Sequence, residues 1–271
     1  MRPGRIFARL LATATLCCAA ATPVFAQDKA ATKPAAKPAA TAKAAVPAEV
    51  RARVVSKMDG AKPEDVSVSP IPGFYEVAVG GMIVYVTADG KYLFSGNLYD
   101  LDTQQNLTAE RRSTARAKAL AAASESDMII FSPPNPKMTV TVFTDVDCQF
   151  CRRFHTQIAD LNKAGVRVRY LLYPRTGPGT QSWKEAEAVW CSKDRRDALT
   201  RAKRGEEIKA QPCADGAKAL KAQYQLGDDL GIEGTPAIFT QSGDYIGGYM
   251  TPAELVNTVA QTQKAAAAAA P

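Results

Sequence analysis

One stretch, residues 139–155, constrains the fold of this chain more than any other; it reads TVTVFTDVDCQFCRRFH. Its first half is rich in threonine and valine, and such β-branched residues predict a short strand. From Cys148 onward the composition favours a helix. Four apolar positions at helical spacing predict one buried stripe along that helix: Phe150, Phe154, Ile158 and Leu161. A pair of cysteines therefore opens a helix directly after a strand.

Cys148 stands where a helix stabilises an anion. The first turn of a helix presents unpaired amide groups and the positive end of the helix dipole. Arg152 and Arg153 add positive charge one turn along. We therefore expect the pKa of Cys148 to lie below the value of about 8.5 for a free thiol, which makes it a nucleophilic thiolate at neutral pH. Cys151 follows on the same helix face, where it can resolve a mixed disulfide formed on Cys148.

Two other interpretations of the C-x-x-C pair remain open. Such a pair is also half of a zinc site, but the chain has no second C-x-x-C and His155 is its only histidine. A purely structural disulfide within the pair would account for the cysteines but not for their position between a strand and a helix. We favour the thiol chemistry, which requires no metal, nucleotide or other cofactor.

The amino terminus, residues 1–26, is typical of a secretory signal peptide. Three arginines precede the apolar stretch 10–21, and small residues follow at the usual cleavage spacing. Cleavage would remove Cys17 and Cys18 and leave four of the six cysteines. An even number in an exported chain indicates an oxidising compartment. No later apolar run reaches the roughly 18 residues that a membrane span needs.

Low-complexity segments flank the predicted folded body. Residues 27–47 are almost entirely Ala, Lys, Pro and Thr and predict a disordered tether, and residues 265–271 form an alanine-rich tail. The net charge of the chain is +7, but residues 1–43 hold seven basic residues and one aspartate, which is +6. The remainder is therefore near +1 (7 minus 6), a balance that argues against nucleic acid as a partner.

Residues 48–106 predict a small α+β domain. A short amphipathic helix is followed by three strands, at 75–79, 82–87 and 92–95. Gly80-Gly81 and Asp89-Gly90 separate the strands and supply the positive φ angles of tight hairpins. At about 60 residues a single core is marginal, so we expect self-association through an edge strand or the open sheet face. The alternative is an appendage that packs on the rest of the chain.

Residues 107–131 are expected to link this domain to a second one at 132–264. Thr108 to Ala123 is rich in Ala, Arg, Lys and Glu without Gly or Pro, which predicts a helix. The prolines of residues 132–136 prevent its continuation. Beyond them the pattern predicts a strand, the cysteine helix, a strand at 166–173, helices over 183–226, a hairpin, and a last helix capped by Thr251 and Glu254. This order is the thioredoxin topology, in which the first two strands are parallel.

Two further features of the second domain concern cysteine and proline. Cys191 and Cys213 are 22 positions apart within the helical insertion, and a structural disulfide is the favoured interpretation. Closing such a loop stabilises a fold by roughly 3 kcal/mol. A second redox pair that exchanges electrons with the first remains the alternative. Thr235-Pro236 precedes a strand, where a cis peptide bond would leave backbone groups free to pair with an extended peptide.

The chain resembles the DsbC and DsbG family of periplasmic thiol-disulfide isomerases from about Val50 to the end of the last helix. The resemblance is densest in four motifs: FTDVDCQFC from 143, YLLYPR from 170, VWCSKD from 189 and GIEGTPA from 231. It implies an α/β thioredoxin-like catalytic domain with a helical insertion and an N-terminal α+β dimerisation domain. It also implies that Cys148 is an exposed nucleophile that Cys151 resolves, that Cys191 pairs with Cys213, and that Thr235 precedes a cis Pro236.

The same resemblance implies a function. A periplasmic homodimer would rearrange or reduce non-native disulfides in misfolded exported proteins, and a DsbD-like thiol reductant in the membrane would regenerate it. The family's usual Gly-Tyr between the cysteines is Gln149-Phe150 here, and its histidine after the second cysteine is Arg152. These departures leave the redox potential open. Two alternatives therefore remain: a DsbG-like reductase of sulfenylated cysteines with chaperone activity, and a non-catalytic holdase chaperone.

Overall fold

The computed structural model describes residues 45–79, 81–211 and 213–269. The predicted signal peptide at 1–26 and residues 27–44 of the predicted tether lie outside the described residues, as do the last two residues of the predicted tail. The first five residues of that tail continue the last helix. Within the described part of the chain, no helix is both long enough and apolar enough to cross a membrane.

The N-terminal domain is a four-stranded antiparallel sheet with one helix packed on it. The strands lie in the order β1-β2-β3-β4 and are Val66–Val68, Phe74–Val79, Met82–Thr87 and Leu93–Ser95. Valines from the helix α1 (Ala48–Val55) and from the sheet form its core: Val50, Val54, Val66, Val77, Val84 and Val86. Gly81 and Gly90 adopt the positive φ angles predicted for the hairpins. The short helix η1 (Pro63–Asp65) lies where Pro63 and Glu64 were expected to open a helical turn, but the strand β1 that follows it was not predicted.

A hairpin and a long helix follow this sheet. The hairpin pairs β5 (Tyr99–Asp100) with β6 (Gln105–Asn106), and α2 runs from Leu107 to Ala122. The predicted helix, 108–123, differs by one residue at each end. Asn106 caps α2 by accepting a hydrogen bond from the Ala109 amide. Thr108 is fully buried, and its hydroxyl is shared by the Tyr85 hydroxyl at 2.6 Å and the Leu98 amide at 2.7 Å.

The C-terminal domain is a five-stranded mixed sheet in the order β11-β10-β8-β9-β7. Only β8 and β9 are parallel; the other neighbours are antiparallel. The strands are β7 (Ile129–Phe131), β8 (Met138–Thr144), β9 (Val166–Leu172), β10 (Ala237–Thr240) and β11 (Tyr245–Gly247). The chain therefore has the predicted thioredoxin fold, to which β7 adds an edge strand too short to stand out in the sequence.

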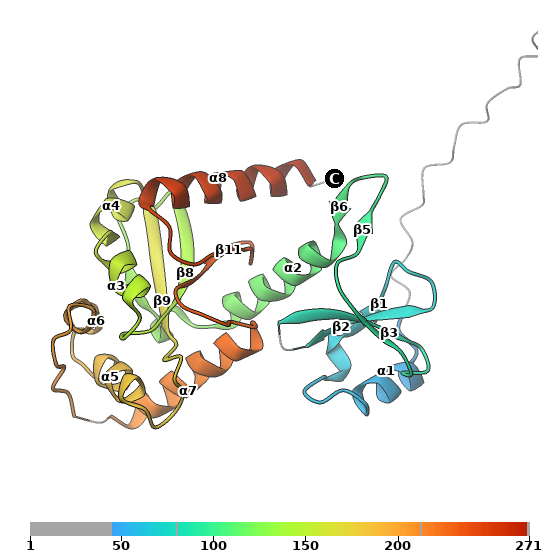
Figure 1. Cartoon of the computed structure of the whole chain (residues 1–271), viewed down its shortest axis with the longest axis horizontal. Coiled ribbons are helices and arrows are strands. Elements are labelled where there is room, and N and C mark those ends of the chain that lie inside the picture. The colour runs from blue at the N-terminus through green and yellow to red at the C-terminus, as the bar shows by residue number, and fades with distance from the viewer. Residues whose placement is uncertain (1–44, 80, 212, 270–271) are drawn as a thin grey trace, which may run out of the picture. The chain divides into compact units, whose positions relative to one another are not determined.

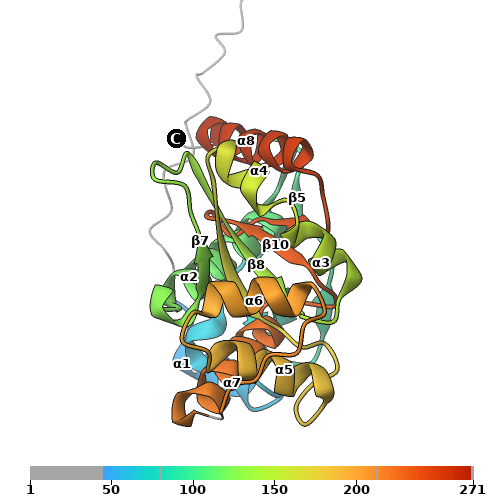
Figure 2. The same ribbon diagram turned by 90° about the vertical axis from the view of Figure 1, so that its left-hand side faces the viewer.

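Helices cover both faces of this sheet (Figures 1 and 2). They are α3 (Gln149–His155), α4 (Ile158–Lys163), α5 (Gln181–Trp190), α6 (Arg195–Lys203), α7 (Ala214–Asp229) and α8 (Pro252–Ala269). Because side chains alternate along a strand, Val142 joins a large core with α3, α4, α6 and α8. Its neighbour Phe143 points to the other face, into a second cluster with Leu120 of α2. At the start of α8, Thr251 and Glu254 exchange hydrogen bonds as predicted.

The predicted buried stripe after the cysteines is correct in part. Phe154, Ile158 and Leu161 are buried, but the Phe150 side chain is 56 % exposed, and two short helices replace the single one. The buried positions of α3 are Cys151, Phe154 and His155. Cys151 therefore occupies the place on the stripe that the sequence pattern assigned to Phe150, because positions three and four residues apart share a helix face.

The buried hydroxyl of Thr108 generates a stability prediction. Thr108→Val would leave the Tyr85 hydroxyl and the Leu98 amide without their shared partner, and we expect a loss of ~1 to 3 kcal/mol in the free energy of unfolding. Urea denaturation measures the loss. Thr114→Val is the matched control, because its hydroxyl is exposed and bonds only to the helix carbonyl of Glu110. Equal stabilities for the two variants would contradict this account of how α2 begins.

Candidate active site

The cysteine pair lies at the junction of β8 and α3, as the sequence predicted. Cys148 is the N-cap residue of α3, and its sulfur accepts a hydrogen bond from the Cys151 amide at 3.4 Å. Both cysteines are free thiols in the structure. The amide that holds the Cys148 sulfur is one of the unpaired groups of a helix start, so the local fold itself provides a donor for a thiolate.

Cys148 is less accessible than the family resemblance implied. Only 2 % of the residue is exposed, so the expectation of an exposed nucleophile is wrong. The cause is the loop before β10: the Cys148 sulfur lies 3.1 Å from the carbonyl oxygen of Thr235. The peptide bond between Thr235 and Pro236 is cis. This loop therefore packs directly against the sulfur that we propose as the nucleophile.

The surroundings of Cys148 favour its ionised form. They lower its pKa to about 5, and the largest cause is a hydrogen bond from the Cys151 side chain. The Thr235 hydroxyl and the Cys151 amide lower it further, and the positive charge of Arg175 adds to them, against the opposing effect of burial. The Thr235 hydroxyl is buried and has no hydrogen-bond partner among the described residues, which leaves it free to donate to a sulfur anion.

Cys151 has the opposite character. It is fully buried, and burial raises its pKa above the ordinary range of a thiol, with a further increase from its hydrogen bond to Cys148. One sulfur of the pair is therefore a thiolate at neutral pH while the other keeps its proton. This division matches the proposed roles, because the thiolate is the attacking species in disulfide exchange.

The positive charge that lowers the pKa of Cys148 comes from a residue that sequence reasoning missed. Arg175 follows β9, and its guanidinium bonds to the Asp145 carboxylate at 2.9 Å. The predicted contributors are engaged elsewhere: Arg152 pairs with Asp147 at 3.1 Å, and Arg153 lies over the ring of Tyr249. The YLLYPR motif contains Arg175, but nothing local in the sequence indicates that its side chain returns to the cysteine loop.

Asp145 organises this loop from inside. Its side chain is 1 % exposed, and it accepts hydrogen bonds from Ser182 at 2.6 Å, from the Asp147 amide at 2.9 Å and from Arg175. Burial alone would raise the pKa of Asp145, but these hydrogen bonds outweigh it and hold the pKa below its usual value. The carboxylate thus stays ionised and fixes the turn between β8 and Cys148.

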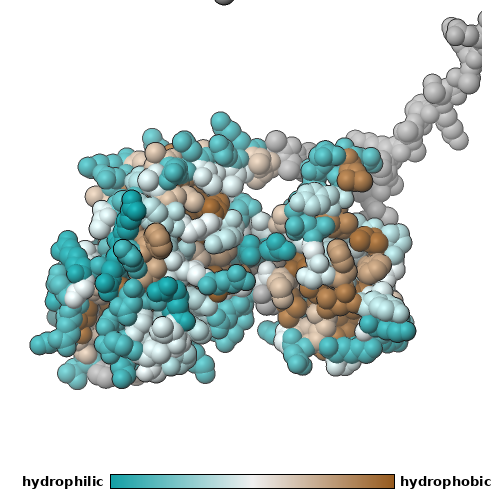
Figure 3. All heavy atoms as spheres, viewed as in Figure 1, coloured by the Kyte–Doolittle hydropathy of each residue, from teal (hydrophilic) through white to brown (hydrophobic). Residues whose placement is uncertain are grey.

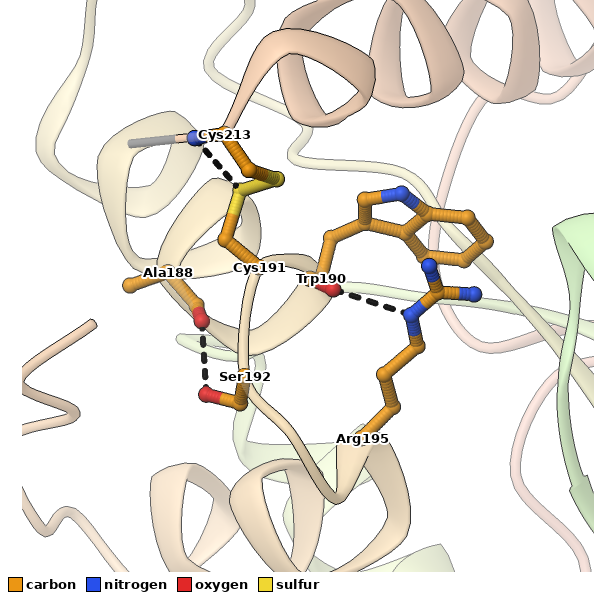
Figure 4. Close-up of a disulfide and its surroundings, with 6 residues drawn as sticks. All are labelled: Ala188, Trp190, Cys191, Ser192, Arg195 and Cys213. Atoms are coloured by element: carbon orange, nitrogen blue, oxygen red, sulfur yellow. Dashed lines mark hydrogen bonds between the residues drawn. A yellow bond between two sulfur atoms is a disulfide. The ribbon is translucent and has the colours of Figure 1, made fainter. Parts of the chain in front are cut away.

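The other two cysteines form a disulfide at a separate place in the domain. Cys191 at the end of α5 and Cys213 at the start of α7 are joined with an S–S distance of 2.05 Å (Figure 4). The bond joins the end of α5 to the start of α7 and so closes the part of the helical insertion that contains α6. Beside it, the Arg195 guanidinium stacks on the Trp190 ring at 3.6 Å. Gly216 lies so close that a Cβ there would be 2.4 Å from the Cys191 sulfur, so the disulfide requires glycine at this position.

Comparisons with known proteins decide the family. Residues 35–109 match the model for the disulfide bond isomerase protein N-terminal domain, and residues 124–263 match the thioredoxin-like domain. The thiol:disulfide interchange protein DsbC of Dickeya dadantii is 37 % identical over 73 % of this chain and 80 % of its own length. The chain belongs to the DsbC family of thiol:disulfide interchange proteins.

Further DsbC proteins show the same extent of similarity. The Escherichia coli protein is 32 % identical over 78 % of this chain and 87 % of its own length. The Haemophilus influenzae protein is 37 % identical over 73 % of this chain and 83 % of its own length. The match to DsbC proteins spans both domains, and the C-x-x-C pair at the helix start of the second domain is free in the structure.

The unequal sulfurs generate a pH prediction. Because the pKa of Cys148 lies near 5, its alkylation by iodoacetamide should be fast and constant from about pH 6.5 to 8, and should fall as the pH drops through 5 and the thiolate is protonated. Mass spectrometry of the reduced protein measures the modified fraction at each cysteine. Cys148→Ser should abolish the fast phase. A rate that keeps rising up to pH 8.5, as for an ordinary thiol, would contradict the assignment.

Proposed function

We propose that this member of the DsbC family rearranges and reduces non-native disulfides in misfolded exported proteins of the periplasm. The observation that carries the proposal is the pair of unequal thiols, a thiolate at Cys148 and a protonated, buried Cys151 three residues on. Such a pair can attack a foreign disulfide and later release itself from it. The chemistry uses the two sulfurs alone, without metal or cofactor.

The reaction begins when the Cys148 thiolate attacks one sulfur of a substrate disulfide. The substrate S–S bond breaks, a mixed disulfide forms, and the second substrate sulfur leaves as a thiolate that takes up a proton. In isomerisation, another substrate thiolate attacks the mixed disulfide and restores the Cys148 thiolate, so no electrons are gained or lost overall. In reduction, Cys151 loses its proton and attacks the Cys148 sulfur, which closes the internal disulfide and leaves the substrate reduced by two electrons.

The internal disulfide must then be reduced from outside the molecule. A thiol reductant of the membrane, similar to DsbD, supplies the two electrons by the same exchange. Export through the predicted signal peptide at 1–26 would place the chain in the periplasm, where such a reductant and its substrates meet. The Cys191–Cys213 disulfide is consistent with folding in an oxidising compartment.

The N-terminal domain supports a homodimer. Its edge strand β4 is exposed at all three residues, Leu93, Phe94 and Ser95, although two of them are large and apolar. Met82 on β3 and Tyr92 beside β4 are also more than half exposed, and apolar side chains gather on the surface of this domain (Figure 3). An apolar, unpaired sheet edge is a favoured surface for association with a second copy.

The catalytic proposal is tested by trapping. Cys151→Ala removes the resolving thiol, so covalent adducts with scrambled ribonuclease should accumulate through Cys148 and appear as reducible species on electrophoresis. Recovery of ribonuclease activity should fall severalfold when both cysteines are replaced by serine. Full activity of that double variant would indicate a holdase. A clear preference for a sulfenylated thiol over scrambled ribonuclease would indicate the DsbG-like reductase instead.

The dimer has a separate test. Phe94→Asp places a charge on the exposed edge of β4, and we expect the self-association constant to fall at least tenfold, because a buried charge opposes an apolar contact. Sedimentation velocity measures the change. Gln225→Asp, which adds the same charge at an exposed position of α7, is the control and should leave association unchanged. An unaltered monomer fraction in Phe94→Asp would exclude this edge as the interface.

A further inference from the structure

A buried lysine that the reaction so far does not use lies beneath the cysteine loop. Lys203 is the last residue of α6 and is 5 % exposed. It lies on the buried stripe of that helix with Ala198, Leu199 and Ala202, so the helix periodicity carries its side chain inward. Lysine is seldom buried unless an opposite charge pairs with it. This burial therefore requires an explanation.

The ammonium group of Lys203 is held by two neutral acceptors. Its Nζ donates to the Thr144 hydroxyl at 2.7 Å and to the Asp145 carbonyl oxygen at 2.6 Å. The described residues place no carboxylate within 4.0 Å of it, since the Asp145 carboxylate is engaged by Arg175 and Ser182. A buried positive charge thus lies at the end of β8 with hydrogen bonds but without a contacting anion.

Both cysteines are among the ionisable groups that act electrostatically on Lys203. Burial lowers the pKa of Lys203 to about 8, whereas Cys151, Asp145 and Cys148 raise it and Arg152 lowers it. The effect is mutual, because the charge of Lys203 in turn lowers the pKa of Cys151. His155 on the same side stays neutral, since burial and the charge of Lys203 lower its pKa to about 4. Besides the Asp145 carboxylate, which is held by Arg175 and Ser182, the groups able to place a negative charge near Lys203 during turnover are the two sulfurs.

We propose that Lys203 is a positioning residue for the resolving step, whose buried positive charge stabilises the Cys151 thiolate at the moment it attacks the mixed disulfide. The inference rests on the thiol exchange proposed above. At that stage the Cys148 sulfur is bonded to substrate and carries no charge, so Cys151 is the sulfur of the pair that can present a negative charge to Lys203. In a low-dielectric interior, an attraction of this kind is much stronger than in water.

The step balances without another reagent. Cys151 gives up its proton and its sulfur forms a bond to the Cys148 sulfur, while the bond from Cys148 to the substrate breaks. The substrate leaves as a thiolate and takes up a proton, so that over the two steps its disulfide has gained two electrons and the enzyme has lost two. Lys203 forms no covalent bond. By favouring resolution over attack from a second substrate thiol, its charge shifts the balance from isomerisation towards reduction.

The same charge acts on the redox equilibrium of the pair. A positive charge stabilises the reduced enzyme, in which Cys148 is a thiolate, and has no such partner in the internal disulfide. Its removal should therefore favour the disulfide. We expect the equilibrium constant against glutathione to shift up to tenfold in that direction, which corresponds to about 30 mV for a two-electron couple.

The experiment replaces Lys203 by methionine, which has a similar apolar stem and no charge. Reduced protein is mixed with oxidised glutathione and quenched with acid, and mass spectrometry follows the Cys148–glutathione adduct. For Lys203→Met we expect resolution about tenfold slower, so that the adduct accumulates, while its formation changes less. Arg204→Met is the matched control: the neighbouring cation is exposed, and its loss should change neither step.

A structural role would give a different result. Lys203→Gln keeps a hydrogen-bond donor for Thr144 and the Asp145 carbonyl but removes the charge, so it should be as slow as Lys203→Met, and it also serves if the methionine variant does not fold. Resolution at the wild-type rate in Lys203→Gln overturns the proposal and would mean that Lys203 only stabilises the structure of the loop through its hydrogen bonds. Failure of the wild-type protein to form any Cys148 adduct would instead reject the proposed function itself.

Discussion

The reactive site depends on an unequal environment for two sulfur atoms three residues apart. Cys148 receives a hydrogen bond from the Cys151 amide in the first turn of α3, which stabilises a negative charge on its sulfur, and the Thr235 side chain lowers its pKa further. Cys151, one turn deeper, is closed off from water, and burial keeps it protonated. Disulfide exchange requires this asymmetry, since two thiolates would repel one another and two thiols would react slowly.

The inequality is maintained by a buried polar frame beneath the loop. Asp145 holds Arg175 and Ser182, and Lys203 holds the Thr144 hydroxyl and the Asp145 carbonyl oxygen. A frame of this kind resists rearrangement because each buried polar group that loses its partner costs free energy. Asp145, Arg175 and Lys203 are also charged, so the same groups that fix the backbone of the loop act electrostatically on the two sulfurs.

The small N-terminal domain contributes in a different way. Its valine core is modest, and it leaves apolar residues on the surface and on the edge strand β4. Thr108 joins the start of α2 to this sheet through the Tyr85 hydroxyl, while Leu120 at the other end of the helix packs into the C-terminal domain. The long helix is thus anchored in a hydrophobic or hydrogen-bonded core at each end.

Much of the fold could be read from local patterns. The strand before Cys148, the helix after it, the hairpins at Gly81 and Gly90 and the capped last helix each depend on residues that are neighbours in the chain. Short edge elements such as β1 and β7 were missed because three residues carry too weak a periodic signal. Phe150 was misplaced because its spacing also fits a stripe that in fact passes through Cys151.

The sequence by itself determined where the two thiols are and which of them begins the helix, because a strand, a turn and a helix start are set by consecutive residues. The tertiary structure decided what acts on those thiols. The Thr235 carbonyl contacts the Cys148 sulfur although the two residues are 87 positions apart in the chain. Lys203 donates to the Asp145 carbonyl across a separation of 58 positions. Such contacts form only when separate elements pack around one core, and neither burial nor the field inside that core is encoded in spacing along the chain.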